Sequence, residues 1–213
     1  MRGIFLTVEG IDGCGKTTQA ELLQNYLIKK GFPVIKTREP GGTSLAEDLR
    51  NILLSPKNLI YPMTELLLYA ASRAQHTQEL IKPSLENGKI VICERYIDAS
   101  LAYQGYGRGI DLSIIERLNE IATEGLKPDI TILFDIDVER AFELKRRNSF
   151  LFDRLEMEEM EFHKRVRNGY LEIAKKEKRF RIIKVDGSVK DVHNKVIEVW
   201  EEFYRCFLQE IGR

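Results

Sequence analysis

The sequence has few cysteines, no long apolar stretch and no excess of either charge sign. Cys14, Cys93 and Cys206 are an odd number at unrelated spacings with no CxxC pair, which argues against a disulfide framework or a zinc site and favours a reducing compartment. The longest clean apolar stretch, 66–71, is far shorter than the roughly 18 residues that a membrane helix needs. The first residues, MRGIFLTVEG, lack the pattern of a signal peptide. We therefore expect a cytoplasmic protein without a membrane segment.

The charges cancel, because 33 Lys and Arg residues balance 33 Asp and Glu residues. This balance argues against a surface built for nucleic acid or for anionic lipid. Apolar residues make up 43% of the 213 residues, which is enough for a sizeable core in a chain of ordinary domain length. Since there is no internal repeat, low-complexity stretch or linker, we expect residues 1–213 to form a single domain.

Short apolar stretches alternate along the chain with longer helical patterns. Such alternation indicates βαβ units, in which helices cover both faces of a parallel sheet. The predicted fold is therefore α/β and doubly wound, with three layers and a five-stranded parallel sheet flanked by helices. The predicted strands are 3–8, 33–36, 89–93, 130–134 and 180–185, and the predicted helices are 18–27, 62–86, 112–121, 138–147, 156–178 and 189–211.

A phosphate-binding loop follows the first predicted strand. The segment GIDGCGKT at 10–17 matches G-x-x-x-x-G-K-[ST] at every fixed position, between a strand and a helix. Glycines let backbone N–H groups surround phosphate oxygens, Lys16 reaches the β and γ phosphates, and the Thr17 hydroxyl can bind Mg²⁺. We interpret Cys14 as a small residue filling the loop rather than a redox control. The predicted ATP-binding residues are Gly10, Ile11, Asp12, Gly13, Cys14, Gly15, Lys16, Thr17 and Thr18.

The residues after the third predicted strand distinguish between classes of P-loop protein. A switch GTPase needs an NKxD guanine motif, which is absent, and an ATPase module needs consecutive acids after a strand. Here strand 89–93 is followed by Glu94 and Arg95. An acid followed directly by an arginine at the carboxyl end of a strand fits a site that holds both a metal and a second anion.

Arginines at the ends of elements form two groups. Arg38, Arg73 and Arg95 are predicted to hold an acceptor phosphate, because arginine suits bidentate phosphate recognition. The segment KRRNSFLFDR at 145–154 joins two helices and is predicted to form a lid, at about 145–156, that closes over ATP. Ordinary surface ion pairs and an exposed loop with incidental charge are the alternatives.

Several longer segments resemble the thymidylate kinase family, in the order expected for it, from Phe5 to about Val192. The segment TREPGGT at 37–43 is the most specific, since it is far rarer than a bare phosphate loop. The segments that carry the resemblance are EGIDGCGKTTQ at 9–19, TREPGGT at 37–43, YAASRAQH at 69–76, ERY at 94–96, SLAYQGYGRG at 100–109, DRLE at 153–156 and RVRNGYLEIA at 165–174.

The resemblance implies phosphorylation of dTMP to dTDP by ATP with Mg²⁺, usually by a homodimer with a five-stranded P-loop NTPase fold. It implies that Arg38 and Arg95 hold the dTMP phosphate, that Tyr69 stacks on thymine, and that Arg73 and Ser100 read the polar edge of the base. Thr17 and Glu94 would contact Mg²⁺, directly or through water. The full substrate-binding set that it implies is Asp12, Arg38, Glu39, Pro40, Tyr69, Arg73, Arg95, Ser100, Tyr103 and Gln104.

The resemblance also bears on the arginines beside the transferred phosphoryl group. In this family they come either from the loop position after Asp12 or from the lid, and here that position is Gly13. The chain therefore resembles the bacterial type, in which the lid supplies them. The implied catalytic residues are Lys16, Asp12, Arg95, Arg146, Arg147 and Arg154.

The predicted reaction is in-line phosphoryl transfer without a covalent intermediate. Two alternatives remain open from the residues: another nucleoside monophosphate or deoxynucleoside kinase of the same fold, and a nucleotide-binding module without turnover. Segments 37–43 and 100–105 argue against the first, and a second anion site with a lid argues against the second. The apolar helix at 62–86 serves either a dimer surface or ordinary core packing.

Overall fold

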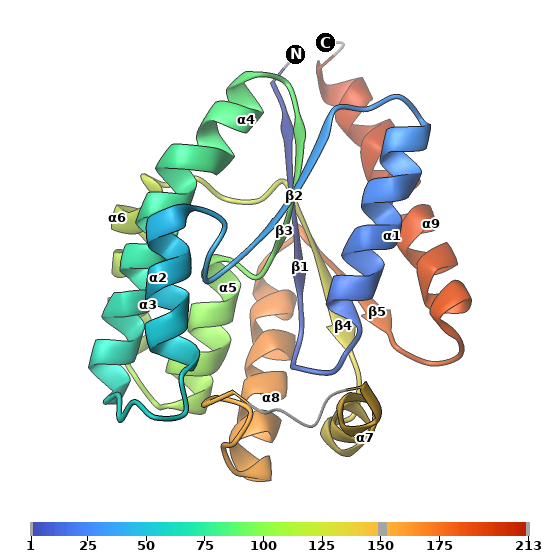
Figure 1. The fold of residues 1–213 in the computed structure, drawn as a ribbon. Coiled ribbons are helices and arrows are strands. Elements are labelled where there is room, and N and C mark those ends of the chain that lie inside the picture. Colours follow the sequence, from blue (N-terminus) through green and yellow to red (C-terminus); the bar gives the residue numbers. More distant parts are fainter. Residues whose placement is uncertain (1, 149–152, 212–213) are drawn as a thin grey trace.

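The computed structural model describes residues 2–148 and 153–211, and it confirms the predicted α/β architecture (Figure 1). Five parallel strands form one sheet in the order β2-β3-β1-β4-β5. The strands are β1 (Ile4–Glu9), β2 (Val34–Arg38), β3 (Ile90–Glu94), β4 (Ile130–Asp135) and β5 (Phe180–Lys184).

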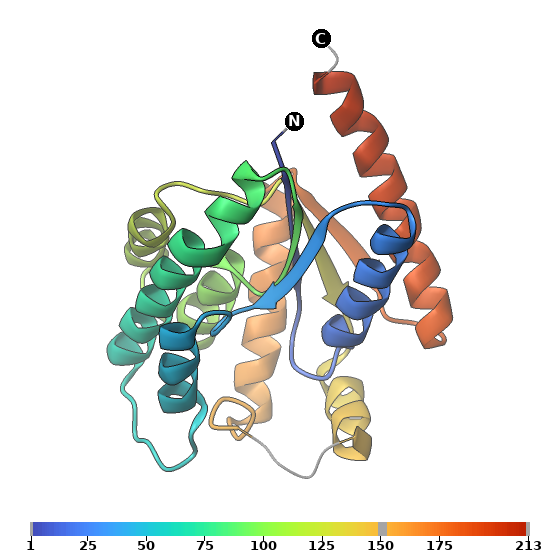
Figure 2. The same ribbon diagram turned by 45° about the horizontal axis from the view of Figure 1, so that its top comes forward.

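Helices cover both faces of this sheet. Helices α1 and α9 pack together on one face, and Figure 2 shows them side by side. The helical layer on the other face includes α3, α6 and α8, so the three predicted layers are confirmed. The helical elements are α1 (Lys16–Lys29), α2 (Ser44–Leu54), α3 (Pro62–His76), the π-helical η1 (Thr77–Ile81), α4 (Lys82–Glu86), α5 (Ile97–Ser100), the π-helical η2 (Leu101–Gly107), α6 (Leu112–Thr123), α7 (Val138–Asn148), α8 (Met160–Lys176) and α9 (Val189–Ile211).

The register of the central strands brings distant segments to one edge of the sheet. Strand β1 is buried along its whole length, as expected for a central parallel strand, and its Val8 lies opposite Glu94 of β3 and Ile132 of β4. The Arg95 N–H continues this pairing by donating to the Val8 carbonyl at 3.0 Å, and the Glu39 N–H donates to the Glu94 carbonyl at 2.8 Å. The chain segments that leave β1, β2 and β3 therefore start from neighbouring points.

The predicted strands are all present, with ends shifted by at most two residues. The predicted helix at 62–86 is continuous but passes through a π-helical turn, η1, between α3 and α4. The sequence analysis assigned no element to α2 or to α5 and η2, which together carry side chains of the candidate site. Within the part of the chain that the structure describes, no helix is long and apolar enough to cross a bilayer.

Candidate active site

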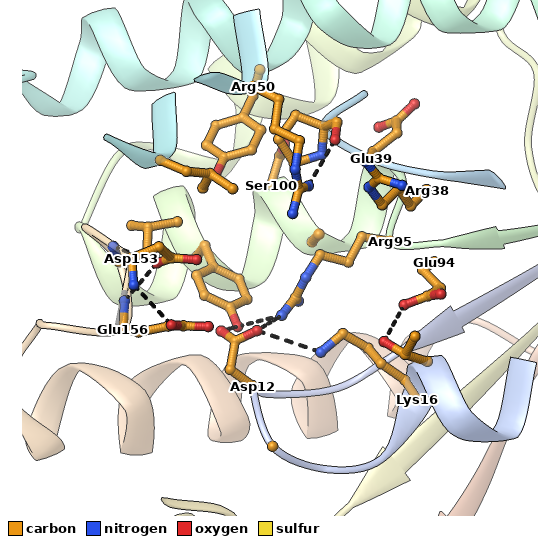
Figure 3. Close-up of a pocket in the computed structure, with 18 of the residues that line it drawn as sticks. Asp12, Lys16, Arg38, Glu39, Arg50, Glu94, Arg95, Ser100, Asp153 and Glu156 are labelled. Atoms are coloured by element: carbon orange, nitrogen blue, oxygen red, sulfur yellow. Dashed lines mark hydrogen bonds and ion pairs between the residues drawn. The ribbon is translucent and has the colours of Figure 1, made fainter. Parts of the chain in front are cut away.

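A cavity of about 520 Å³ lies at the carboxyl-terminal edge of the sheet (Figure 3). Its walls come from the loop between β1 and α1, the loop after β2, helices α2 and α3, the segment after β3, and residues 153–156. The structure thus brings most of the predicted site residues around one space. Those that line it are Asp12, Gly13, Lys16, Thr17, Arg38, Glu39, Pro40, Tyr69, Glu94, Arg95, Ser100, Tyr103 and Gln104.

The loop at 10–17 has the close packing that its glycines predict. A Cβ atom on Gly13 would lie 2.3 Å from the carbonyl oxygen of Ala141, so α7 packs against the loop at a distance that only glycine allows. The Lys16 ammonium donates to the Ile11 carbonyl at 3.2 Å. Cys14 is 1% exposed, and burial raises the pKa of its thiol, which agrees with the prediction that it fills the loop.

Asp12 and Arg95 join the phosphate loop to the segment after β3. A guanidinium N–H of Arg95 donates to Asp12 Oδ1 at 2.7 Å, and the Tyr103 hydroxyl donates to Asp12 Oδ2 at 2.8 Å (Figure 3). Burial by itself raises the pKa of Asp12, but the positive charges of Arg95 and Lys16 outweigh burial and hold that pKa well below its usual range. Asp12 is therefore a permanent carboxylate at this junction.

Thr17 and Glu94 meet at the side of the cavity next to β3. The Thr17 hydroxyl donates to Glu94 Oε2 at 2.7 Å, and the Lys36 ammonium lies 3.8 Å from Glu94 Oε1. One carboxylate and one hydroxyl suit Mg²⁺, which takes most of its ligands from phosphates and water. The residues described here contain no cluster of three or more His, Cys, Asp or Glu side chains that could hold a metal by themselves. The donor set therefore fits a magnesium ion that arrives with a nucleotide.

Arg73 lies beneath the cavity rather than on its wall. Its guanidinium donates to Glu39 Oε2 at 2.7 Å and to the Ser100 hydroxyl at 2.9 Å, and its side chain is 1% exposed. It also donates to Asn119 Oδ1 and to the Tyr96 carbonyl. The implied direct contact of Arg73 with the base thus stays a prediction, while its contacts in this structure orient Glu39 and Ser100, which do line the cavity.

Two arginines, Arg38 from β2 and Arg50 from α2, line another part of the cavity wall. The Arg38 guanidinium donates through Nη2 to both carboxylate oxygens of Glu47, each at 3.0 Å. Arg50, which the sequence analysis did not identify, donates to the Pro40 carbonyl at 2.8 Å and lines the cavity (Figure 3). Burial and the neighbouring charge of Arg38 lower the pKa of Arg50, which indicates a concentration of positive charge here.

The predicted lid is described in part. Arg154 donates to Glu65 Oε2 at 2.6 Å and to the Leu53 carbonyl at 2.9 Å, so it ties residues 153–156 to α2 and α3 and does not line the cavity. Arg146 is exposed and also lies off the cavity wall, whereas Lys145 lines it and pairs with Glu156. The Arg147 side chain and residues 149–152 lie outside the described residues.

A sequence profile of the thymidylate kinase family matches residues 8–196. A thymidylate kinase of Caldanaerobacter subterraneus subsp. tengcongensis is 51% identical over 207 residues, which cover 96% of this chain and 98% of that protein. The chain belongs to the thymidylate kinase family. A thymidylate kinase of Geotalea daltonii is 53% identical over 192 residues, covering 87% and 89% of the two chains. The crystal structure of thymidylate kinase from Ehrlichia chaffeensis superposes with a TM-score of 0.78 at 40% identity, covering 94% of this chain and all of that one.

This thymidylate kinase family member has further cavity residues that sequence reasoning did not identify. Arg50 lies on α2, for which no helix was predicted, so no signal placed it near the phosphate loop. Lys145 and Glu156 lie inside the predicted lid segment at about 145–156, in which only the arginines are predicted to act. The additional residues that line the cavity are Glu21, Lys36, Arg50, Leu54, Ala99, Lys145, Asp153, Leu155 and Glu156.

Proposed function

We propose that this chain transfers the γ-phosphoryl group of ATP to dTMP and forms dTDP. The observation that carries the proposal is that the phosphate loop and Arg95 face one cavity and are joined through Asp12, in a member of the thymidylate kinase family. One polyanion on the loop and a second beside Arg95 would meet in this space. Phosphoryl transfer requires mainly positioning and charge stabilisation, so a covalent nucleophile is not needed.

On the donor side, the backbone of residues 10–18 would hold the ATP phosphates, with Lys16 on the β and γ phosphates. Thr17 and Glu94 would hold Mg²⁺, directly or through water, and the ion would neutralise charge that develops on the phosphates. Asp12 keeps Lys16 and Arg95 on one side of the cavity, since it accepts from both. These side chains bind and orient the donor.

On the acceptor side, Arg38 and Arg95 would bind the dTMP phosphate, while Asp12 and Glu39 would lie near the sugar and that phosphate. Tyr69 would stack on thymine. Ser100, Tyr103, Gln104 and Pro40 complete the wall on which the nucleotide would rest, with Arg73 beneath it. Support for this arrangement is that the phosphate-binding cations and the aromatic ring line the same cavity.

Residues 145–156 would act as a lid within a single domain that comprises the whole chain. Lys145 and Glu156 already line the cavity from either end of this segment and pair with each other. Arg146, Arg147 and Arg154 are the candidates for a cation that reaches the transferred phosphoryl group. For Arg154 this requires release from Glu65 when nucleotides bind.

The active form would be a cytoplasmic homodimer that binds neither nucleic acid nor membranes. Helices α2, α3 and α6 lie together on one side of the molecule (Figure 1) and expose large apolar side chains. Sedimentation at micromolar concentration should give twice the chain mass. Leu67→Glu, at a side chain of α3 that is 49% exposed, should give the monomer. A monomer in the unmodified protein would contradict the dimer. The exposed apolar side chains on these helices and in the loop between α2 and α3 are Leu45, Ile52, Leu59, Tyr61, Met63, Leu67, Ile114 and Ile121.

The decisive experiment measures ADP release from Mg·ATP with dTMP, dUMP, dCMP, AMP and thymidine supplied separately. Strong turnover with dTMP and much weaker turnover with the others is expected. Arg95→Ala should then lose acceptor binding by about 100-fold while retaining ATP binding, because a charge-assisted contact to the phosphate is removed. Fast turnover with a different acceptor would leave a kinase but overturn the acceptor pocket, and ATP binding without transfer would overturn the enzyme.

A further inference from the structure

Tyr170 is a buried tyrosine on α8 whose hydroxyl connects two charged groups. The hydroxyl donates to Glu9 Oε2 at 2.7 Å and accepts from Arg95 Nη1 at 3.0 Å. The residue is 1% exposed and does not line the cavity that contains Arg95. Its polar end is therefore directed at protein groups and cannot touch a nucleotide in that cavity.

Glu9 fixes the other end of this chain of hydrogen bonds. It lies at the carboxyl end of β1, is fully buried, and accepts from the Tyr96 N–H through Oε1 at 2.8 Å. The same carboxylate thus binds the backbone directly after Arg95 and, through Tyr170, the Arg95 side chain. Arg95 is held from both directions by one buried carboxyl group.

Arg95 needs such support because its backbone is unfavourable. Its φ angle is 66°, in the left-handed region that residues other than glycine rarely adopt. Its guanidinium also donates to the Gly10 carbonyl at 3.0 Å and lies over the ring of Tyr103. Contacts with the surrounding protein must offset the cost of this backbone, and Tyr170 supplies the one that comes from α8.

We propose that Tyr170, anchored by Glu9, is a positioning residue that holds Arg95 ready for the phosphate of the acceptor nucleotide. The inference rests on the proposed function, in which Arg95 binds that phosphate. The hydroxyl accepts an N–H of Arg95 and thereby helps to fix the plane of the guanidinium, which decides the direction from which a phosphate can approach it. A preorganised guanidinium binds its anion without first losing side-chain freedom.

Ordinary core packing is the competing role for Tyr170. Its ring packs edge-on to Tyr103 with centroids 6.3 Å apart, and a phenylalanine would keep that contact. Packing alone does not explain the hydroxyl, because it accepts a hydrogen bond from Arg95 and donates one to Glu9. Tyr170→Phe removes the hydroxyl and leaves the ring, so it separates the two roles.

The experiment compares Tyr170→Phe with the unmodified protein by calorimetric titration of dTMP and, separately, of a non-hydrolysable ATP analogue. It is performed at pH 8, above the value of about 7 to which burial raises the pKa of Glu9. We expect dTMP to bind about tenfold more weakly and the ATP analogue to bind within twofold of its original affinity. The KM for dTMP should rise by a similar factor.

Tyr26→Phe is the matched control. Its hydroxyl also donates to a carboxylate, that of Glu201, but this bond joins α1 to α9 and lies outside the cavity lining. Both variants lose one tyrosine–carboxylate bond, but that of Tyr26 is only partly buried, so urea unfolding of both variants is measured alongside the titrations. Only Tyr170→Phe should weaken dTMP binding. Glu9→Gln leaves either the Tyr96 N–H or the Tyr170 hydroxyl without its acceptor, so it should also weaken dTMP binding.

Combination with Arg95→Ala tests whether Tyr170 acts through the arginine. If it does, Tyr170→Phe has no further effect on dTMP binding once Arg95 is absent. The proposal is overturned if the two losses multiply, or if Tyr170→Phe and Glu9→Gln bind dTMP as Tyr26→Phe does. Failure of the unmodified protein to bind dTMP is a different result, since it overturns the proposed function first.

Discussion

A single glycine sets the distance between the phosphate loop and helix α7. The space that a Cβ atom on Gly13 would need is already occupied by the Ala141 carbonyl and, at 3.3 Å, by Lys145 Cβ. An arginine at this loop position would displace α7, which explains in packing terms why the loop carries none. Lys145 of α7 instead adds a positive charge to that of Lys16 on this side of the cavity.

Gly13→Ala should therefore lower the free energy of unfolding by more than the strain of a positive φ alone would. Gly13 has a φ of 80° and Gly125 a φ of 76°, but a Cβ on Gly125 would meet nothing within 4 Å. Gly125→Ala should lower the free energy of unfolding by about 1 kcal/mol, and Gly13→Ala by about 3 kcal/mol, because the second adds a clash with backbone. Urea unfolding of both variants measures the difference, and equal losses would show that α7 moves aside freely.

Glu9 makes stability depend on pH in a direction opposite to that of most carboxylates. Burial, and then the charge of Asp98, raises the pKa of Glu9 to about 7. Between the ordinary glutamate pKa and 7 the folded protein holds a proton that the unfolded chain has lost, so this residue lowers the free energy of unfolding as pH rises. Glu9→Gln removes that contribution. The stability of Glu9→Gln relative to the unmodified protein should increase from pH 5 to pH 8, and a constant difference would contradict the assignment.

The sequence predicted which arginines lie close to the cavity better than it predicted which of them line it. Arg38, Arg73 and Arg95 were grouped from their places at element ends, and all three lie at one edge of the sheet. Nothing in the sequence separated Arg73, whose partners Glu39 and Asn119 lie 34 and 46 residues away, from Arg95 on the cavity wall. Burial of an arginine depends on such distant partners, which local spacing does not encode.

At the scale of elements, Glu65 on α3 joins three other segments. It is fully buried and accepts from Gln104 of η2, from Arg108 after η2, and from Arg154 of the predicted lid. Two arginines share one carboxylate at the point where these segments meet. The position of residues 153–156 therefore depends on α3.

Glu65→Gln should lower the free energy of unfolding by about 3 kcal/mol, because it removes the carboxylate partner of Arg154 and one of the two carboxylates that pair with Arg108, the other being Glu158. Glu120→Gln is the control, since Glu120 and its partner Arg117 are 62% and 68% exposed, and its loss should stay within about 0.5 kcal/mol. Thermal and urea unfolding measure both. A loss at Glu65 no larger than that at Glu120 would mean that the lid segment is held by other contacts.

The strands were predictable as elements and α2 was not. Strand β3 is buried throughout, and its short continuous apolar sequence is typical of a central parallel strand. Helix α2 buries only Ala46 and Leu53, so its pattern is weak, and η2 contains glycines that usually mark loops. As a result Arg50 remained outside the predicted site, although it lies on the cavity wall.

At the scale of the whole molecule, the reaction rates of the buried thiols measure how often the protein unfolds. Cys206 is exposed, whereas Cys14 and Cys93 are buried, and burial raises the pKa of both buried thiols. We expect one thiol of the native protein to react with a disulfide reagent within seconds and the other two only at the rate of unfolding, with all three reacting in denaturant. Peptide mapping identifies the thiol that reacts, and a fast reaction of Cys14 while Cys93 stays slow would show that the phosphate loop opens by itself.

The strand order has a consequence for how the chain is made. Strand β1 is synthesised first, but its neighbours in the sheet are β3 and β4, and the backbone of Phe5 is also bonded to Asp129. During translation, the loop at 10–17 therefore leaves the ribosome long before the strands that hold it on either side. A nascent chain that ends before β4 lacks one of these neighbours, so we expect nucleotide binding on the ribosome only after residue 135 has emerged from the exit tunnel.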